Sequence, residues 1–360
     1  MRSFTLFSLE AVSKLHMGGW AARRGTPLRA DSLRFRALRW LLVTALLSCL
    51  LAGCQERASE VRAEPESSPA RAVPAEMRTF EIARSSRKFD VQAGAALVID
   101  NHFGDVEVAA GGAQVQVESV VYARGVDLED ARVRAASLTI DGKPDPDDGF
   151  TIAVEYGGSR SDVRADLAVA APPETRLKVR VRTGRTRVRG LAGVEVRGQA
   201  GDVEVSDIAG AASVDTTSGD VRATGLRGRA TVRCSSGSVE LAGIGDSVLA
   251  RTLSGRISLT DIRGDSLTTS TGSGDIDVRL GMPWAGQLEA RSKSGRITVS
   301  LPADSNCRVT TATGSGDIAS ELPLTDVSRQ GRNISGRLGR GEGLVDIATG
   351  SGDIRLLPAT

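Results

Sequence analysis

The feature that most constrains this chain is a Ser-Gly pair that recurs through its C-terminal half. Successive glycines from Gly184 to Gly352 stand 16 to 21 residues apart. A period of this length indicates a repeat architecture, in which every repeat is one structural unit. The clear copies are Gly219, Gly237, Gly255, Gly274, Gly295, Gly316, Gly336 and Gly352, and weaker copies occur at Gly104, Gly184 and Gly201.

The residues around these glycines predict a parallel β-solenoid. Two positions after the glycine stands an aliphatic residue in every copy, as in Val221 and Ile257, and the residue between is mostly polar. This alternation is typical of a strand. A second short strand precedes the glycine, as in residues 230–234, and a second turn falls near Gly225, Gly243 or Gly264. We therefore expect an all-β stack of coils of roughly 18–21 residues, with glycine providing tight corners and serine bonding the turn backbone.

Composition favours a thin structure over a globular one. Phe, Trp and Tyr make up only 3% of the 360 residues, whereas glycine is abundant at 41. A narrow interior filled with small aliphatic side chains fits this composition, because ordinary cores draw much of their buried area from aromatics. The net charge of +2 gives no global field that would attract nucleic acid.

The residue after each glycine predicts a charge ladder. It alternates in sign through Arg256, Asp275, Arg296, Asp317, Arg337 and Asp353. Stacked coils would place these side chains one above another, so that a slip of one coil brings like charges together. The alternative is a sugar-binding or polysaccharide-cleaving groove along the same edge. Aromatic platforms for sugar rings are scarce, however, and Trp284 in a longer loop is the one tryptophan beyond the N-terminal segment.

The N-terminal segment, 1–53, is expected to be a lipoprotein signal peptide. Three arginines precede an apolar run from Trp40 to Leu51, which is too short to span a bilayer. The following Leu-Ala-Gly-Cys resembles the bacterial lipobox, and this resemblance implies that Cys54 is lipidated. An ordinary signal peptide or a short buried helix is the alternative. Residues 54–79 are then a flexible tether, and Gln55 favours the outer membrane by the sorting rule of enteric bacteria.

Residues 80–180 are expected to form a β-rich lead-in with one short helix, and residues 181–357 the solenoid repeats. Alternation in residues 115–121 predicts a half-buried strand. Asp127 is placed to cap a helix that reaches Ala136. Residues 143–149 predict an exposed turn, whose prolines do not fit a calcium loop.

Few residues beyond the signal could carry chemistry. His102 is the one remaining histidine, and no nucleophile motif accompanies it. No His and Cys cluster has the spacing of a zinc site, so neither a metal nor another cofactor is expected. Cys234 and Cys307 lie four coils apart in the expected stack, about 19 Å. We therefore predict two unpaired, mostly buried thiols.

The repeats resemble a bacterial putative-adhesin family, a domain-of-unknown-function family with a β-solenoid fold. The resemblance covers roughly residues 85–357. It rests on Thr-Gly-Ser-Gly-Asp-Ile at 271–276 and 313–318, on Ser-Gly-Arg-Ile at 254–257 and 294–297, and on Asn-His-Phe-Gly-Asp at 101–105. It implies the fold more than an activity, since the family has no established common activity.

Together these patterns predict a lipid-anchored, non-enzymatic cell-envelope protein with an adhesin-like solenoid that acts as a scaffold or binding surface. Its partners would be the membrane, through the lipid, and an envelope protein, peptidoglycan or surface polymer. Neither nucleic acid nor a small-molecule substrate is expected. The alternative is a polysaccharide-binding or polysaccharide-cleaving β-helix, and an envelope-stress sensor is a third hypothesis.

Overall fold

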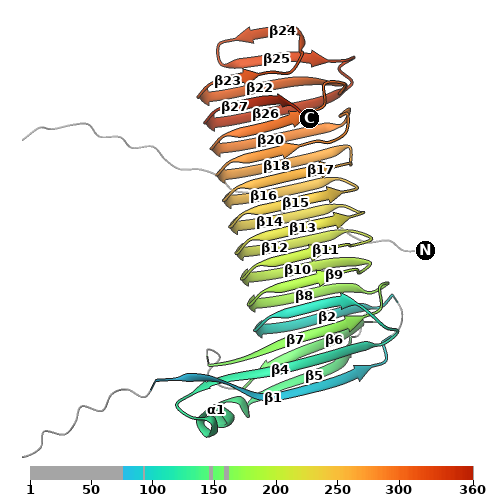
Figure 1. Cartoon of the computed structure of the whole chain (residues 1–360), viewed down its shortest axis with the longest axis vertical. Coiled ribbons are helices and arrows are strands. Elements are labelled where there is room, and N and C mark those ends of the chain that lie inside the picture. The colour runs from blue at the N-terminus through green and yellow to red at the C-terminus, as the bar shows by residue number, and fades with distance from the viewer. Residues whose placement is uncertain (1–75, 92–93, 146–148, 158–161, 360) are drawn as a thin grey trace, which may run out of the picture. The chain divides into compact units, whose positions relative to one another are not determined.

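The structure is a computed structural model, and it describes residues 76–91, 94–145, 149–157 and 162–359. The expected signal peptide, Cys54 and nearly all of the expected tether lie outside these ranges. Within them the chain forms 27 β-strands and one helix, arranged as two long sheets (Figure 1). Most neighbouring strands in both sheets are parallel, which confirms the all-β solenoid class.

The two sheets are here named A and B. Sheet A has 13 strands in the spatial order β1 (Arg78–Phe89), β4 (Val115–Gly125), β7 (Val163–Ala171), β3 (Val106–Ala110), β9 (Thr186–Arg189), β11 (Val203–Ser206), β13 (Val221–Leu226), β15 (Val239–Ile244), β17 (Ile257–Ile262), β19 (Ile276–Arg279), β21 (Ile297–Leu301), β27 (Ile354–Pro358) and β23 (Ile318–Ser320). Sheet B has 14 strands in the order β24 (Thr325–Gln330), β25 (Asn333–Leu338), β22 (Cys307–Ser315), β26 (Gly343–Ser351), β20 (Gln287–Ser294), β18 (Ser266–Ser273), β16 (Val248–Ser254), β14 (Ala230–Ser236), β12 (Ala212–Ser218), β10 (Gly193–Ala200), β8 (Arg176–Thr183), β2 (Ala96–Phe103), β6 (Gly149–Tyr156) and β5 (Leu138–Asp145).

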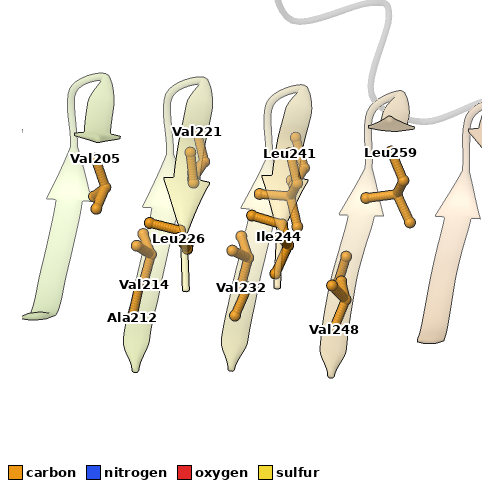
Figure 2. Close-up of a cluster of buried hydrophobic side chains, with 14 of the residues drawn as sticks. Val205, Ala212, Val214, Val221, Leu226, Val232, Leu241, Ile244, Val248 and Leu259 are labelled. Carbon is orange, nitrogen blue, oxygen red and sulfur yellow. The ribbon is translucent and has the colours of Figure 1, made fainter. Parts of the chain in front are cut away.

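Each coil is one strand of sheet B, a tight corner and one strand of sheet A. Neighbouring coils pair in register, so that Val214 lies opposite Val232 in sheet B and Val221 opposite Val239 in sheet A. Strand alternation turns these aliphatic side chains inward, and all four are at most 1% exposed. Figure 2 shows that the same inward position recurs from strand to strand, and the result is one continuous aliphatic core.

The Ser-Gly glycines form the corners because no other residue fits there. Gly255 has φ = 147°, and a Cβ on it would lie 2.0 Å from the carbonyl oxygen of Gly237 in the neighbouring coil. Corner positions at Gly219, Gly237, Gly274, Gly295, Gly316 and Gly352 have φ between 121° and 149°. Gly225 and Gly243, with φ = 66°, are left-handed residues inside β13 and β15, one residue before each strand ends at the second corner. Gly264 instead permits close approach, since its Cβ would lie 2.3 Å from the Asp246 backbone.

The segment before the repeats builds both the first coil and a cap. Strand β2 pairs with β8 and β3 pairs with β9, so residues 96–110 form a coil around Gly104 within the stack. Between β3 and β8 the chain forms β4, α1 (Leu128–Ala135), β5, β6 and β7, and β1 lies antiparallel on β4. The expected helix is confirmed, because the Asp127 side chain caps it by accepting a 2.8 Å hydrogen bond from the Asp130 amide.

The coils at the C-terminal end are not stacked in sequence order. The coil β26–β27 lies between β20–β21 and β22–β23, with parallel pairing on both sides. An antiparallel hairpin of β24 and β25 then covers β22 (Figure 1). The prediction of a corner at Gly336 is therefore wrong, since Gly336 lies inside β25. The nearby Gly331, with φ = 60°, turns the chain back and makes this segment a hairpin instead of a coil.

Candidate functional site

The charged column beside the corner glycines differs from the expected ladder. In stack order its C-terminal part is Arg256, Asp275, Arg296, Asp353 and Asp317, because the last coil intercalates. Asp353 and Asp317 are therefore neighbours of like charge. Arg337 is absent from the column and pairs with Asp326 at 2.5 Å within the hairpin. The strict alternation predicted for this position is thus wrong at the C-terminal end.

The aspartates of this column act mainly on the backbone. Asp220 Oδ1 accepts a 2.8 Å hydrogen bond from the Ser238 amide, and Asp275 Oδ1 accepts one of 2.9 Å from the Arg296 amide. Asp353 accepts from the Asp317 amide in the same way, at 3.1 Å. Each carboxylate therefore pairs with the corner amide of an adjacent coil. The one ion pair of the expected ladder within the described residues is Arg256–Asp275, at 3.8 Å and exposed, which contributes little.

A buried column of Thr, Ser and Cys side chains lies three residues before the corner glycines of the later coils, and four of its hydroxyls bond the corner of the adjacent coil. Thr271 Oγ1 donates to the Gly255 carbonyl at 3.2 Å, and Ser292 Oγ donates to the Gly274 carbonyl at 3.2 Å. Cys234 occupies the same place, with its Sγ 3.5 Å from the Gly219 carbonyl oxygen. The serines directly before the glycines are exposed. Sequence reasoning assigned the bonding role to those serines, although the recurring Thr, Ser or Cys three residues before glycine was visible.

The outer face of sheet A carries an alternating ion-pair ladder that sequence reasoning missed. Its members, one on each successive coil, are Glu107, Arg187, Glu204, Arg222 and Glu240. Arg187 pairs with Glu204 at 3.3 Å and Arg222 pairs with Glu240 at 2.7 Å. The hydrogen bond that Arg222 donates to Glu240 is the main cause that raises the pKa of Arg222. Four of these five charges are therefore paired with one another within the fold.

The outer face of sheet B is basic over strands β8 to β16, and most of its cations have no ion-pair partner among the described residues. Strands β8, β10, β12, β14 and β16 direct seven basic and two acidic side chains outward. The basic ones are Arg176, Lys178, Arg180, Arg182, Arg197, Arg233 and Arg251, and the acidic ones are Glu195 and Asp215. Among the residues that the structure describes, only Arg197 of these seven has an ion pair, to Glu195 at 2.8 Å. We name these nine residues the basic face.

A hollow of about 400 Å³ opens at one end of the basic face, over strands β2, β8 and β10. Its polar lining consists of Asp100, His102, Arg180, Arg182, Arg197 and Gln199. Arg182 Nε donates to Gln199 Oε1 at 3.1 Å, which holds that guanidinium across two coils. The hollow offers several hydrogen-bond donors and positive charge, the chemistry of an anion-binding surface.

The same hollow lacks the parts of a hydrolytic device. His102 is about half exposed, and its Nδ1 lies 4.0 Å from Asp100 Oδ1. No serine, threonine or cysteine lines the hollow, so the imidazole has no nucleophile to activate there. His102 therefore lies on the surface, as expected for a histidine beside a turn.

The two cysteines and Trp284 are buried. Cys307 is 0% exposed, and burial raises the pKa of its thiol to about 11. Cys234 lies on β14 and Cys307 on β22, five coils apart instead of the expected four, because the coil β26–β27 lies between them. Trp284 is 4% exposed and fills the interior of a longer coil. It therefore presents no platform for a sugar ring.

Two further observations concern the described residues alone. Across residues 76–359, outside the gaps given above, no three His, Cys, Asp or Glu side chains are placed to hold a metal ion. In the same ranges, no helix combines the length and apolar character that crossing a membrane requires.

Comparison with known families identifies the domain. The family described as Toastrack DUF4097 matches residues 95–357. The chain belongs to this family. The Toastrack match begins just before β2 and ends in β27, so it spans the first coil, the cap insertion and the intercalated last coil.

Solved structures similar to this Toastrack chain at low sequence identity include the following three. A putative cell adhesion protein from Clostridium sporogenes has 11% identity and a TM-score of 0.25, with 77% of this chain and 100% of that chain covered. A putative adhesin from Bacteroides fragilis has 10% identity and a TM-score of 0.37, with 76% and 97% covered. One from Parabacteroides merdae has 10% identity and a TM-score of 0.28, with 76% and 96% covered. Curated proteins gave no match.

Proposed function

We propose that this Toastrack protein is a lipid-anchored, non-enzymatic protein of the cell envelope, whose solenoid serves as a rigid binding surface. The observation that carries the proposal is the contrast between its two faces. Sheet A pairs its charges internally, as in Arg222–Glu240, whereas sheet B leaves most of its cations without an acidic partner among the described residues. Unpaired, regularly spaced cations on a stiff sheet are suited to a partner outside the chain.

The non-enzymatic part of the proposal is supported by the composition of the hollow beside His102. A general base needs a nucleophile or a bound water held by an orienting group. The imidazole here has an acid 4.0 Å away and no hydroxyl or thiol among the lining residues. The exposed columns of the solenoid repeat along the stack instead of converging on one point.

Anchoring is supported by the sequence of residues 34–54, where basic residues, an apolar run and Leu-Ala-Gly-Cys follow one another. A diacylated Cys54 followed by a polar tether would hold the solenoid beside the membrane without a spanning helix. Gln55, in place of aspartate, favours the outer membrane. The adhesin-like role fits the same arrangement, since the solenoid would stand in the envelope with its faces accessible.

The test compares the intact protein with a Cys54→Ala form in the bacterium that produces it. We expect the intact protein to sediment with outer membranes and to carry a diacylglycerol on Cys54, detected by mass spectrometry of the N-terminal peptide. The Cys54→Ala form should lose the lipid and leave the membrane fraction. Equal membrane association of both forms would contradict the anchor.

A pull-down from detergent-solubilised envelopes tests the binding role. We expect a specific envelope component to be recovered with the intact protein and to remain chemically unaltered. If a recovered glycan becomes measurably shorter on incubation with the protein, the non-enzymatic assignment is wrong and the polysaccharide-cleaving alternative holds.

A further inference from the structure

We propose that the basic face of sheet B, centred on β8 and β10, binds an acidic polysaccharide through its carboxylate groups. This inference rests on the proposed binding function and names the class of its partner. It begins from strand β8, whose sequence Arg-Leu-Lys-Val-Arg-Val-Arg-Thr alternates cations with buried aliphatic residues. All the cations of this strand therefore point to one side.

The spacing of these cations suits a polymer with repeated anionic groups. Along β8, successive outward residues are about 6.7 Å apart, and neighbouring coils are about 4.8 Å apart. Arg180 and Arg197 are direct partners across the two coils. The column then passes through Asp215 and continues with Arg233 and Arg251, again as direct partners. The cations thus form a grid of fixed pitch, which flexible surface lysines on loops would not provide.

Most of these cations are available because no acid in the described part of the fold pairs with them. Arg180, Arg233 and Arg251 form no ion pair or side-chain hydrogen bond among the residues that the structure describes. On sheet A, by contrast, Arg187, Arg189 and Arg222 are all paired with acids of neighbouring coils. A guanidinium left free in this way can donate two parallel hydrogen bonds to one carboxylate.

The surroundings of the cations favour a polysaccharide over a membrane surface. No large hydrophobic residue is exposed on β8 or β10; the nearest exposed one on this face is Leu253 on β16. A headgroup surface would be expected to receive apolar side chains as well as charge. The hollow instead adds Gln199, His102 and Asp100, whose polar groups suit sugar hydroxyls.

The same surroundings disfavour nucleic acid. Proteins that bind single strands stack bases on aromatic side chains. Strands β8 and β10 carry no aromatic residue. A polymer whose charge sits on carboxylates and whose remaining groups are hydroxyls is therefore the partner that the basic face fits best.

The test measures binding of the full chain carrying Cys54→Ala, so that lipid does not contribute. Its probes are polygalacturonate, neutral dextran, phosphatidylglycerol-containing vesicles and single-stranded DNA, titrated by calorimetry at low and at moderate salt. The face variant is Lys178→Gln, Arg180→Gln and Arg182→Gln together. The matched control is Arg187→Gln, Arg189→Gln and Arg222→Gln, which removes the same charge from sheet A.

We expect polygalacturonate to bind and dextran not to bind. The face variant should weaken the binding at least about tenfold, because the loss of even one charge-assisted hydrogen bond corresponds to roughly that factor. The control variant should change it less than about twofold. Circular dichroism of both variants checks that the solenoid is retained, and the variant side chains are all exposed.

Three outcomes would overturn the proposal. They are absence of polygalacturonate binding, equal weakening by the two variants, and tighter binding of vesicles or DNA than of polygalacturonate through the same residues. None of these outcomes would change the result of the anchoring test or of the envelope pull-down. A failure of the polysaccharide proposal is therefore distinguishable from a failure of the proposed function.

Discussion

The substitution Gly255→Ala tests the corner geometry on which the solenoid depends. Residue 255 has φ = 147°, a region in which residues with a side chain are strained, at a cost of about 1–3 kcal/mol. The new Cβ would also lie 2.0 Å from the Gly237 carbonyl oxygen. One of the two coils must therefore retreat by about 1 Å or more to reach van der Waals distance.

This displacement would disrupt the hydrogen bonds on either side of the corner. The Gly237 amide donates to the Ser254 carbonyl at 3.1 Å, and the Val239 amide donates to the Arg256 carbonyl at 2.8 Å. Two such bonds contribute about 1–3 kcal/mol together. Strain and lost bonds predict that Gly255→Ala lowers the free energy of unfolding by about 2–6 kcal/mol.

Urea unfolding of the intact chain, followed by circular dichroism, measures this change. The control is Gly281→Ala, whose Cβ would meet only one atom, the Asp261 Oδ1 at 4.0 Å; we expect a change within about 0.5 kcal/mol. Because each coil contacts only its neighbours, amide exchange should accelerate in β14–β17 and not in β4 or β7. A difference below about 1 kcal/mol between the two variants would refute the corner argument.

Three further changes test other features. Asp275→Ala should lower the free energy of unfolding by about 1 kcal/mol, because the Arg296 amide loses a charged acceptor. Arg256→Ala should change it by less than about 0.5 kcal/mol, because its ion pair is exposed. If urea unfolding shows the larger loss for Arg256→Ala, the ion-pair ladder is favoured instead. The neutral Cys307 thiol stabilises the fold fully below pH 9 and loses this contribution as pH rises toward its raised pKa of about 11. Between pH 9 and pH 11, the free energy of unfolding should therefore fall by up to about 3 kcal/mol more in the wild-type protein than in Cys307→Ser. Parallel profiles of unfolding free energy against pH for the two proteins would contradict this. Deletion of residues 343–360 should abolish amide protection in β22–β25 and leave that of β10–β16 intact, as hydrogen exchange would detect; unchanged protection in β22 would exclude an essential role for the intercalated coil.

The sequence predicted the repeating parts of the fold well. The period of the glycines and the aliphatic residue two positions later were enough to give two strands and two corners per coil. These features are local, since one corner and its flanking strands follow from about 20 consecutive residues. The helix cap at Asp127 was predictable for the same reason.

The order of the last coils was not predictable, because all coils have equivalent edges. Strand β22 could pair with β20 or with β26 without any change in its inward pattern, and only the hairpin at Gly331 shows that the segment 325–338 leaves the stack. Gly336 follows a serine and precedes Arg-Leu, so its local sequence matches a corner although it lies in a strand.

The candidate binding surface was visible in the sequence but not recognised there. Four cations alternate along residues 176–182, but this local pattern does not show which of them meet an acid on another coil. Whether a cation has a partner depends on the residue beside it on the adjacent coil, which is 17 or 18 positions away in the sequence. Arg187 and Arg180 belong to one coil, yet only Arg187 meets an acid, Glu204, on the next coil.

The intercalated coil has a consequence for how the protein is made. Residues 343–358 are synthesised after β22–β25, yet they occupy the place between β20 and β22. Until they arrive, β20 and β22 cannot form their final pairings in sheet B. The far end of the stack therefore takes its final form only after residues 343–358 have been added, and a chain cut short before this segment would leave a strand edge exposed.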